Sequence, residues 1–286
     1  MSRHDQGIVF IVLAAFSFAL MGFFVRMAGD IPTTQKMFFR NVVAVAIAFG
    51  ALVRSGQGFR IQQGSLPLLL MRSTMGTLGI LFNFYALDHM LLSDANMLGK
   101  LAPFFAIIMS TFLLKEKANR IEYGSVLIAM LGAMLVAKPT FGSEMIPALS
   151  AVLGAFTAGT AYTYVRLLGR NGERGPIIVL FFSVFSCLCA LPFLIFDYHP
   201  MSWQQLGWLL LAGCAASGGQ FSVTAAYTRA PAKDISVFDY SQILFSALLG
   251  MAFLDQFPDH WSLLGYLIII GTAVGKWLYT RKHGEA

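Results

Sequence analysis

The sequence contains few charged residues. Only 12% of its 286 residues are Asp, Glu, Lys or Arg, whereas 57% are hydrophobic and the mean hydropathy is +0.69. Soluble globular domains carry about 25% charged residues, and a water-soluble fold of this length cannot bury so many long, nearly charge-free stretches. The shortage of charge therefore excludes an ordinary soluble protein and predicts one that crosses a membrane several times.

Cysteine and the common catalytic motifs are also scarce. Cys187, Cys189 and Cys214 lie inside apolar runs, without the spacing of a zinc site or a disulfide framework. The sequence has no GxxxxGK[ST] loop, no HExxH and no serine nucleophile elbow. We therefore expect no metal, no cofactor and no enzymatic activity, although a membrane-embedded enzyme remains a competing class. A channel is a further alternative, but no filter signature stands out.

Ten apolar stretches are each long enough to cross a bilayer, which takes about 20 residues. The connecting loops are short, and no separate soluble domain is visible. The first stretch is followed by more of the same, so we expect it to be retained as a span. The predicted spans are residues 7–28, 34–54, 66–87, 92–114, 120–138, 146–168, 176–196, 204–227, 234–255 and 260–280.

Lysine and arginine gather in alternate loops. One side has Lys36 and Lys138, with Arg26 at the end of the first span. The positive-inside rule predicts that both termini are cytoplasmic in the cytoplasmic (inner) membrane. Because these residues occupy short loops, the net charge of +6 is no sign of nucleic-acid binding. The other side has Arg3, Arg54, Arg60, Lys115, Lys117, Arg120, Arg166, Arg170, Arg174, Arg229, Lys233, Lys276, Arg281 and Lys282.

The two halves of the sequence resemble each other. Residues 13–29 (LAAFSFALMGFFVRMAG) align with residues 153–169 (LGAFTAGTAYTYVRLLG), an offset of 153 − 13 = 140. Each repeat has an odd number of spans, namely five. The second half therefore enters the membrane from the opposite face, as in many secondary transporters. The predicted fold is an all-α membrane protein of ten transmembrane helices in two inverted five-helix repeats. The same offset pairs Gly79 with Gly219, Ala86 with Ala226, Asp94 with Asp234 and Leu114 with Leu254.

The segment FNFYALDHMLLSDANMLGKLAPFFAIIMSTFLLKEK (82–117), Arg40 in FFRNVVA and Arg72 in LLLMRSTMGTLG carry a family resemblance. They resemble the EamA-domain family of the drug/metabolite transporter superfamily. The resemblance implies a first EamA-like repeat over residues 1–140 (spans 1–5) and a second over 141–286 (spans 6–10). It is weaker in the second half, where FDYSQILFSALLGMAFLDQF ends in Asp-Gln instead of Gly-Glu or Lys-Glu. It implies a secondary transporter driven by a substrate, proton or other ion gradient.

Two charged residues lie within predicted spans, far from the loops. Lys100 lies about eight residues into the fourth span, at a depth of about 12 Å, where a charge costs roughly 3 kcal/mol. It is either the counter-charge of an anionic substrate group or one half of a salt bridge, for example with Asp239. Asp239 has three interpretations: a proton-coupling carboxylate, an amine-binding group, or the ion-pair partner of a basic residue.

Arg40 and Arg72 lie about two turns from the ends of their spans, so each is either a gating or structural group or a substrate contact. The excess of cations predicts an anionic or zwitterionic substrate, of carboxylate or amino-acid type. The alternative is export of amines or drug-like cations through Asp239. The GxxxG of 271–275 allows close helix contact within the chain or in a homodimer, so the protein is a monomer or a homodimer. Neutral candidates, which either bind substrate or join helices, are Asn83, Tyr85, Asn96, Tyr162, Tyr164, Gln220, Tyr240 and Gln242.

Overall fold

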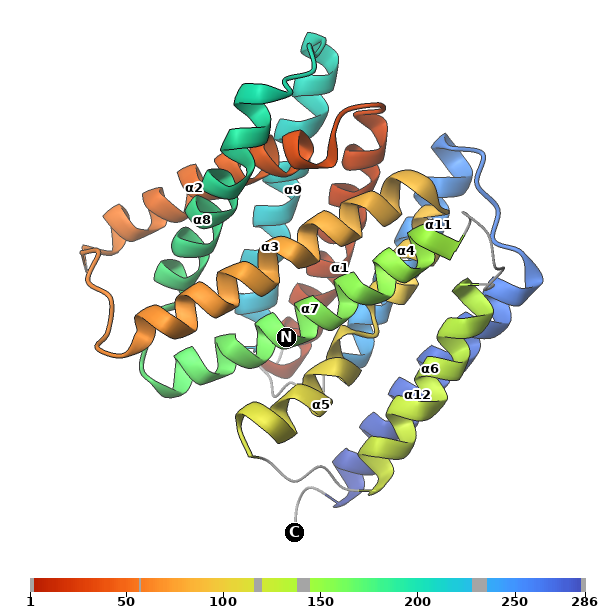
Figure 1. Ribbon diagram of the computed structural model, residues 1–286. Coiled ribbons are helices and arrows are strands. Elements are labelled where there is room, and N and C mark those ends of the chain that lie inside the picture. Colours follow the sequence, from red (N-terminus) through yellow and green to blue (C-terminus); the bar gives the residue numbers. More distant parts are fainter. Residues whose placement is uncertain (1–2, 57, 116–119, 138–144, 228–235, 284–286) are drawn as a thin grey trace.

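The computed structural model describes residues 3–56, 58–115, 120–137, 145–227 and 236–283 (Figure 1). Every regular element within these ranges is a helix. Lys117, Lys138, Arg229, Lys233 and Asp234, which entered the orientation and repeat arguments, lie outside the described residues. The elements are α1 (Arg3–Met27), α2 (Thr33–Ser55), α3 (Ser65–His89), α4 (Leu92–Gly99), α5 (Ala102–Leu113), α6 (Arg120–Ala137), α7 (Met145–Arg170), α8 (Gly175–Phe196), α9 (Trp203–Tyr227), the 3₁₀-helix η1 (Ser236–Tyr240), α11 (Ser241–Phe253) and α12 (His260–His283).

The ten predicted spans are confirmed. Within the described residues, eight helical stretches of 20 to 26 residues are long and apolar enough to cross a membrane, and α4 and α5 together form one of them. Two shorter apolar helices, Tyr123–Ala137 and Phe238–Phe253, occupy the positions of the fifth and ninth spans. Large apolar side chains remain exposed on the outside of the bundle, among them Leu131 at 61% and Leu188 at 61%. Such apolar faces suit contact with lipid chains. The helical backbone adds to this, because its polar groups are hydrogen-bonded within the helix.

The two halves interleave around one another. The most extensive contacts join α1 to α9, α3 to α7, α2 to α8 and α6 to α12. Under the offset of 140 residues, the α1–α9 pair is the counterpart of the α3–α7 pair, and each of the other two pairs is its own counterpart. Figure 1 shows α6 and α12 side by side, away from α2 and α8. This arrangement is expected for two inverted five-helix repeats that share one core.

Glycines allow a close helix approach between α6 and α12. A Cβ atom added to Gly265 would lie 2.6 Å from the carbonyl oxygen of Gly132 and 2.5 Å from Val136 Cγ2. Small residues at such crossings let helix backbones meet. Gly271 and Gly275 of the predicted GxxxG motif have open space around them, so the close contact within the described chain uses Gly132 and Gly265 instead.

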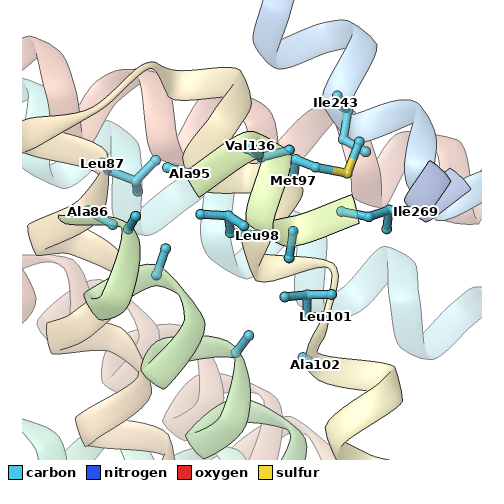
Figure 2. Close-up of a cluster of buried hydrophobic side chains, with 14 of the residues drawn as sticks. Ala86, Leu87, Ala95, Met97, Leu98, Leu101, Ala102, Val136, Ile243 and Ile269 are labelled. Atoms are coloured by element: carbon cyan, nitrogen blue, oxygen red, sulfur yellow. The ribbon is translucent and has the colours of Figure 1, made fainter. Parts of the chain in front are cut away.

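A buried apolar cluster surrounds the interruption between α4 and α5. Side chains of α4 and of the following turn, including Met97, Leu98 and Leu101, pack with Ile243 of α11 and Ile269 of α12 (Figure 2). Met97, Leu98 and Leu101 are each 0% exposed. Close packing restricts how far core groups can shift, so the interruption is held at a defined place inside the bundle.

Candidate substrate site

The two halves depart from regular α-helix at equivalent positions, which we call the two interruptions. α4 ends at Gly99, and α5 begins at Ala102 with Pro103 in its first turn. Proline lacks a backbone N–H and cannot continue the hydrogen bonding of a helix interior, but its fixed φ suits a first turn. In the second half, η1 gives way to α11 after Tyr240. Because 240 − 100 = 140, this second interruption corresponds to Lys100. Interrupted helices near the bilayer midplane are where many secondary transporters bind substrate.

An ion pair joins the two interruptions. Lys100 Nζ donates a hydrogen bond to Asp239 Oδ2 at 2.5 Å, and the two side chains are 11% and 28% exposed. Of the two interpretations of Lys100, the salt bridge is therefore present in this structure. Asp239 is accordingly an ion-pair partner here. The carboxylate is the more accessible of the two charged groups.

Arg40 and Arg72 are half-buried, and some of their guanidinium nitrogens are enclosed by the protein. Arg40 Nη1 donates to the Asn41 side-chain oxygen at 2.6 Å, and its Nε is buried without a hydrogen-bond partner. The Arg72 guanidinium lies 3.8 Å above the ring centre of Phe182, and its Nε and Nη1 are buried without partners. No acidic side chain in the described ranges forms a salt bridge with either arginine.

Tyr162 lies near both the arginines and the ion pair. Its side chain is 60% exposed, yet it lies within electrostatic range of Arg40, Arg72 and Asp239. The exposed apolar stripe of α7 ends at Phe156, and six further residues rotate the helix by about 240°. Tyr162 therefore points away from that stripe, toward the side of α7 on which the arginines lie. The sequence marked Tyr162 as one polar residue among eight and gave no sign of its direction.

Several of the remaining candidates lie in contacts between helices, whereas Tyr85 stacks on His89 at the end of α3. Asn96 Nδ2 donates to Leu92 O at 2.8 Å and to Ser246 Oγ at 3.1 Å, and Gln242 Nε2 donates to Asn96 Oδ1 at 2.8 Å. These bonds tie α4 to α11. Tyr240 is 9% exposed and belongs to the apolar core. Asn83 is half-buried beside Gly99. Substrate contact by any of these residues stays a prediction.

Lys36 corrects one sequence expectation. It was assigned to an outer loop, but it lies inside α2, is 1% exposed, and donates to Asp88 Oδ1 of α3 at 2.6 Å. Hydropathy does not predict this pair, because the partners are 88 − 36 = 52 residues apart. Arg26, at the end of the first predicted span, donates to the carbonyl of Leu87 at 2.6 Å.

The end of the bundle that is predicted to face outward carries further polar links. Asp94 accepts hydrogen bonds from Ser262 Oγ at 3.1 Å and from the Tyr266 hydroxyl. Gln256 accepts one from the Leu92 N–H at 2.9 Å. Arg26, Asp94 and Gln256 also line a pocket of about 390 Å³ at this end. Together with the pair formed by Lys36, these links join α1, α2, α3, α4 and α12.

Comparison with known proteins gives consistent matches. The EamA-like transporter family matches residues 5–138 and 145–276. The pseudopaline exporter CntI of Pseudomonas aeruginosa is 30% identical over 268 residues, covering 93% of each chain. Solute carrier family 35 member G1 of Mus musculus is 25% identical over 96% of this chain and 80% of its own. A solved crystal structure with 18% identity has a TM-score of 0.70 over 99% of both chains, which establishes the same fold.

Proposed function

Because the chain belongs to the EamA-like transporter family, we propose that it carries a small anionic or zwitterionic metabolite, of carboxylate or amino-acid type, by alternating access. Membership of a transporter family decides against an enzyme. The observation that carries the proposal is the ion pair between Lys100, in the break between α4 and α5, and Asp239, in the 3₁₀ turn that leads into α11.

A zwitterion can replace this ion pair without leaving a charge unpaired. A carboxylate would bind Lys100 and an ammonium group would bind Asp239, so each buried charge exchanges one partner for another. Breaking a buried pair without such replacement is costly. The exchange removes the direct link between the two interruptions only when substrate is present. Substrate would then shift the balance between two conformations through different contacts in each.

The proposed setting is the cytoplasmic membrane, with both termini inside and net movement outward. The orientation rests on the alternating distribution of lysine and arginine between loops. The direction rests on the similarity to a protein named as the pseudopaline exporter. A proton or a counter-substrate would supply the driving force. The inverted repeats support alternating access, because exchange of conformations between equivalent halves exposes one site to each face in turn.

Export of amines or drug-like cations is the second candidate, and one observation favours it. Asp239 is 28% exposed whereas Lys100 is 11% exposed, so a cation reaches the carboxylate before an anion reaches the ammonium group. In that case Lys100 competes with the cargo for Asp239. Replacement of Lys100 would then strengthen amine binding.

The test is substrate-dependent thermal stabilisation and counterflow in proteoliposomes. The purified protein is heated with carboxylates, zwitterionic amino acids, amines and neutral sugars, because a ligand that binds only the folded state raises the unfolding temperature. We expect stabilisation and counterflow by a zwitterion or carboxylate, and loss of both in Lys100→Ala. The exposed Lys282→Ala serves as the control.

Each outcome separates the two candidates. Stabilisation by amines that persists or grows in Lys100→Ala would favour the cation exporter. Unchanged counterflow kinetics in Lys100→Ala would overturn the role of Lys100 in substrate binding.

A further inference from the structure

The two arginines lie together in the described interior. Arg40 of α2 and Arg72 of α3 lie on helices that both pack against α8, and both are near Tyr162 of α7. Phe182 of α8 covers one face of the Arg72 guanidinium at 3.8 Å. We name these four residues the arginine pocket. It adjoins the ion pair of Lys100 and Asp239, since Tyr162 also interacts with Asp239.

The arginine pocket carries net positive charge. A guanidinium stays protonated in proteins, and Lys100 is neutralised by Asp239. Arg40 and Arg72 therefore contribute two positive charges that no carboxylate in the described ranges balances through a salt bridge. Buried charge without a partner is strongly unfavourable, and ionisable groups at this depth mark substrate or ion paths.

Structural arginines in this protein use their donors differently. Arg26 donates to the carbonyls of Leu87 and Met90 at 2.6 and 3.3 Å. Arg174 donates to the carbonyls of Gly58 and Arg60, both at 3.0 Å. In contrast, Arg40 Nε, Arg72 Nε and Arg72 Nη1 are buried with no acceptor among the residues that the structure describes.

Further polar atoms on the same helices repeat this pattern. The side-chain nitrogen of Asn41 and the hydroxyls of Ser73 and Ser183 are also buried without partners. In the sequence, Asn41 follows Arg40, Ser73 follows Arg72, and Ser183 follows Phe182. Hydrogen-bonding groups that are not used between helices are available to a ligand.

We propose that the arginine pocket is a second subsite, which binds a carboxylate or phosphate group of the transported molecule. The inference rests on the proposed function, in which Lys100 and Asp239 hold the charged head of the same molecule. It defines the cargo as an acidic metabolite that carries an additional oxyanion and has net negative charge. The two parallel N–H donors of a guanidinium can bind two oxygens of a carboxylate or phosphate at once. Phe182 holds one face of Arg72, so its N–H groups are presented in a fixed plane.

The test measures anion binding to the purified protein in detergent, without transport. Thermal unfolding is followed against millimolar sodium sulfate and sodium succinate at constant ionic strength set with sodium chloride. Succinamide, the neutral diamide, is the control for succinate. The variants are Arg40→Met and Arg72→Met, which keep an unbranched side chain but remove the donors. Arg54→Gln, an exposed arginine of the same helix as Arg40, is the matched control.

We expect saturable stabilisation of the native protein by sulfate and succinate, and none by succinamide. Arg54→Gln should respond like the native protein. Arg40→Met and Arg72→Met should lose about tenfold or more in sulfate affinity, since a hydrogen bond to a charged group exceeds the energy of one decade. Both variants should be at least as stable as the native protein without anions, because they remove unpartnered buried charge.

Two results would overturn the proposal. One is an equal response to sulfate and succinate in the native protein and in both arginine variants, which would indicate a general salt effect. The other is the absence of any saturable response in the native protein. Loss of unliganded stability in both variants would indicate that the arginines hold the helices together, and would also contradict it.

The double variant Lys100→Met/Asp239→Asn separates this proposal from the proposed function. If the arginine pocket is correct, the double variant still binds sulfate, whatever happens to transport. If the double variant transports normally while the arginine variants lose sulfate binding, the head-group site is wrong and the arginine pocket stands. If transport is lost and sulfate binding is unaffected by the arginine substitutions, the proposed function stands and the arginine pocket is wrong.

Discussion

Lys100 Nζ lies 2.5 Å from Asp239 Oδ2, and these two residues stand at equivalent interruptions of helices from the two halves of the chain. The pair therefore links the halves at a point where the backbone of each departs from regular α-helix. Irregular backbone inside a membrane protein is tolerated where it is buried in protein or lines a water-filled cavity. The Lys100–Asp239 pair is largely enclosed by protein, while the Asp239 carboxylate remains partly accessible.

The first prediction concerns the stability of this pair. Lys100→Met leaves the Asp239 carboxylate without its partner, and we expect a loss of about 1–3 kcal/mol in unfolding free energy. The additional change Asp239→Asn removes the isolated charge and should restore most of that loss, since a buried pair replaced as a unit is often neutral. Thermal unfolding of both variants in detergent, followed by tryptophan fluorescence, measures the difference. A double variant as unstable as the single one would show that the pair is not the cause.

The second prediction concerns the direction of Tyr162. In a background in which Cys187, Cys189 and Cys214 are replaced by alanine, Tyr162→Cys should react rapidly with a charged methanethiosulfonate reagent in proteoliposomes. Leu153→Cys, on the exposed apolar stripe of the same helix, should stay unreactive because lipid excludes the reagent. Mass spectrometry of the intact protein measures the labelled fraction. Equal labelling at both positions would place Tyr162 outside the accessible interior.

Much of the fold follows from the sequence, because hydropathy and the internal repeat can both be detected from the order of the residues alone. The spans, the inverted repeat and the choice of Lys100 and Asp239 as candidates required only run lengths and an offset. The burial of Lys36 against Asp88 did not follow, because both residues lie near span ends and look like loop charges. The free donors of Arg40 and Arg72 also could not be foreseen, since a sequence does not state which carbonyls or acids an arginine reaches.

The third prediction concerns the crossing of α6 and α12. Gly265→Leu forces a side chain into a space where a Cβ alone would lie 2.6 Å from the carbonyl oxygen of Gly132. We expect a loss of about 1–3 kcal/mol or more, typical of overpacking, seen as a lower unfolding temperature. Gly271→Leu on the same helix has nothing within 4 Å of its added Cβ and should be nearly neutral in a monomer. A strong loss at Gly271 alone would instead indicate that the GxxxG motif forms an interface between copies.

The last prediction tests how Arg72 is positioned. A Cβ added to Gly76, one turn further along α3, would lie 2.8 Å from Arg72 Nη1 and 2.8 Å from Phe182 Cε2. The end of an arginine side chain can move aside, so Gly76→Ala should fold, helped by the higher helix propensity of alanine. The guanidinium, however, should leave its place above the Phe182 ring.

We therefore expect Gly76→Ala to keep its unfolding temperature within a few degrees of the native value while it loses about tenfold in sulfate affinity. Gly50→Ala, on α2 with open space around its added Cβ, is the control and should bind sulfate normally. Because Gly76→Ala keeps both arginines, it changes their geometry without changing the net charge. Native sulfate affinity in this variant would mean that the stacked position of Arg72 does not matter and that charge alone attracts the anion.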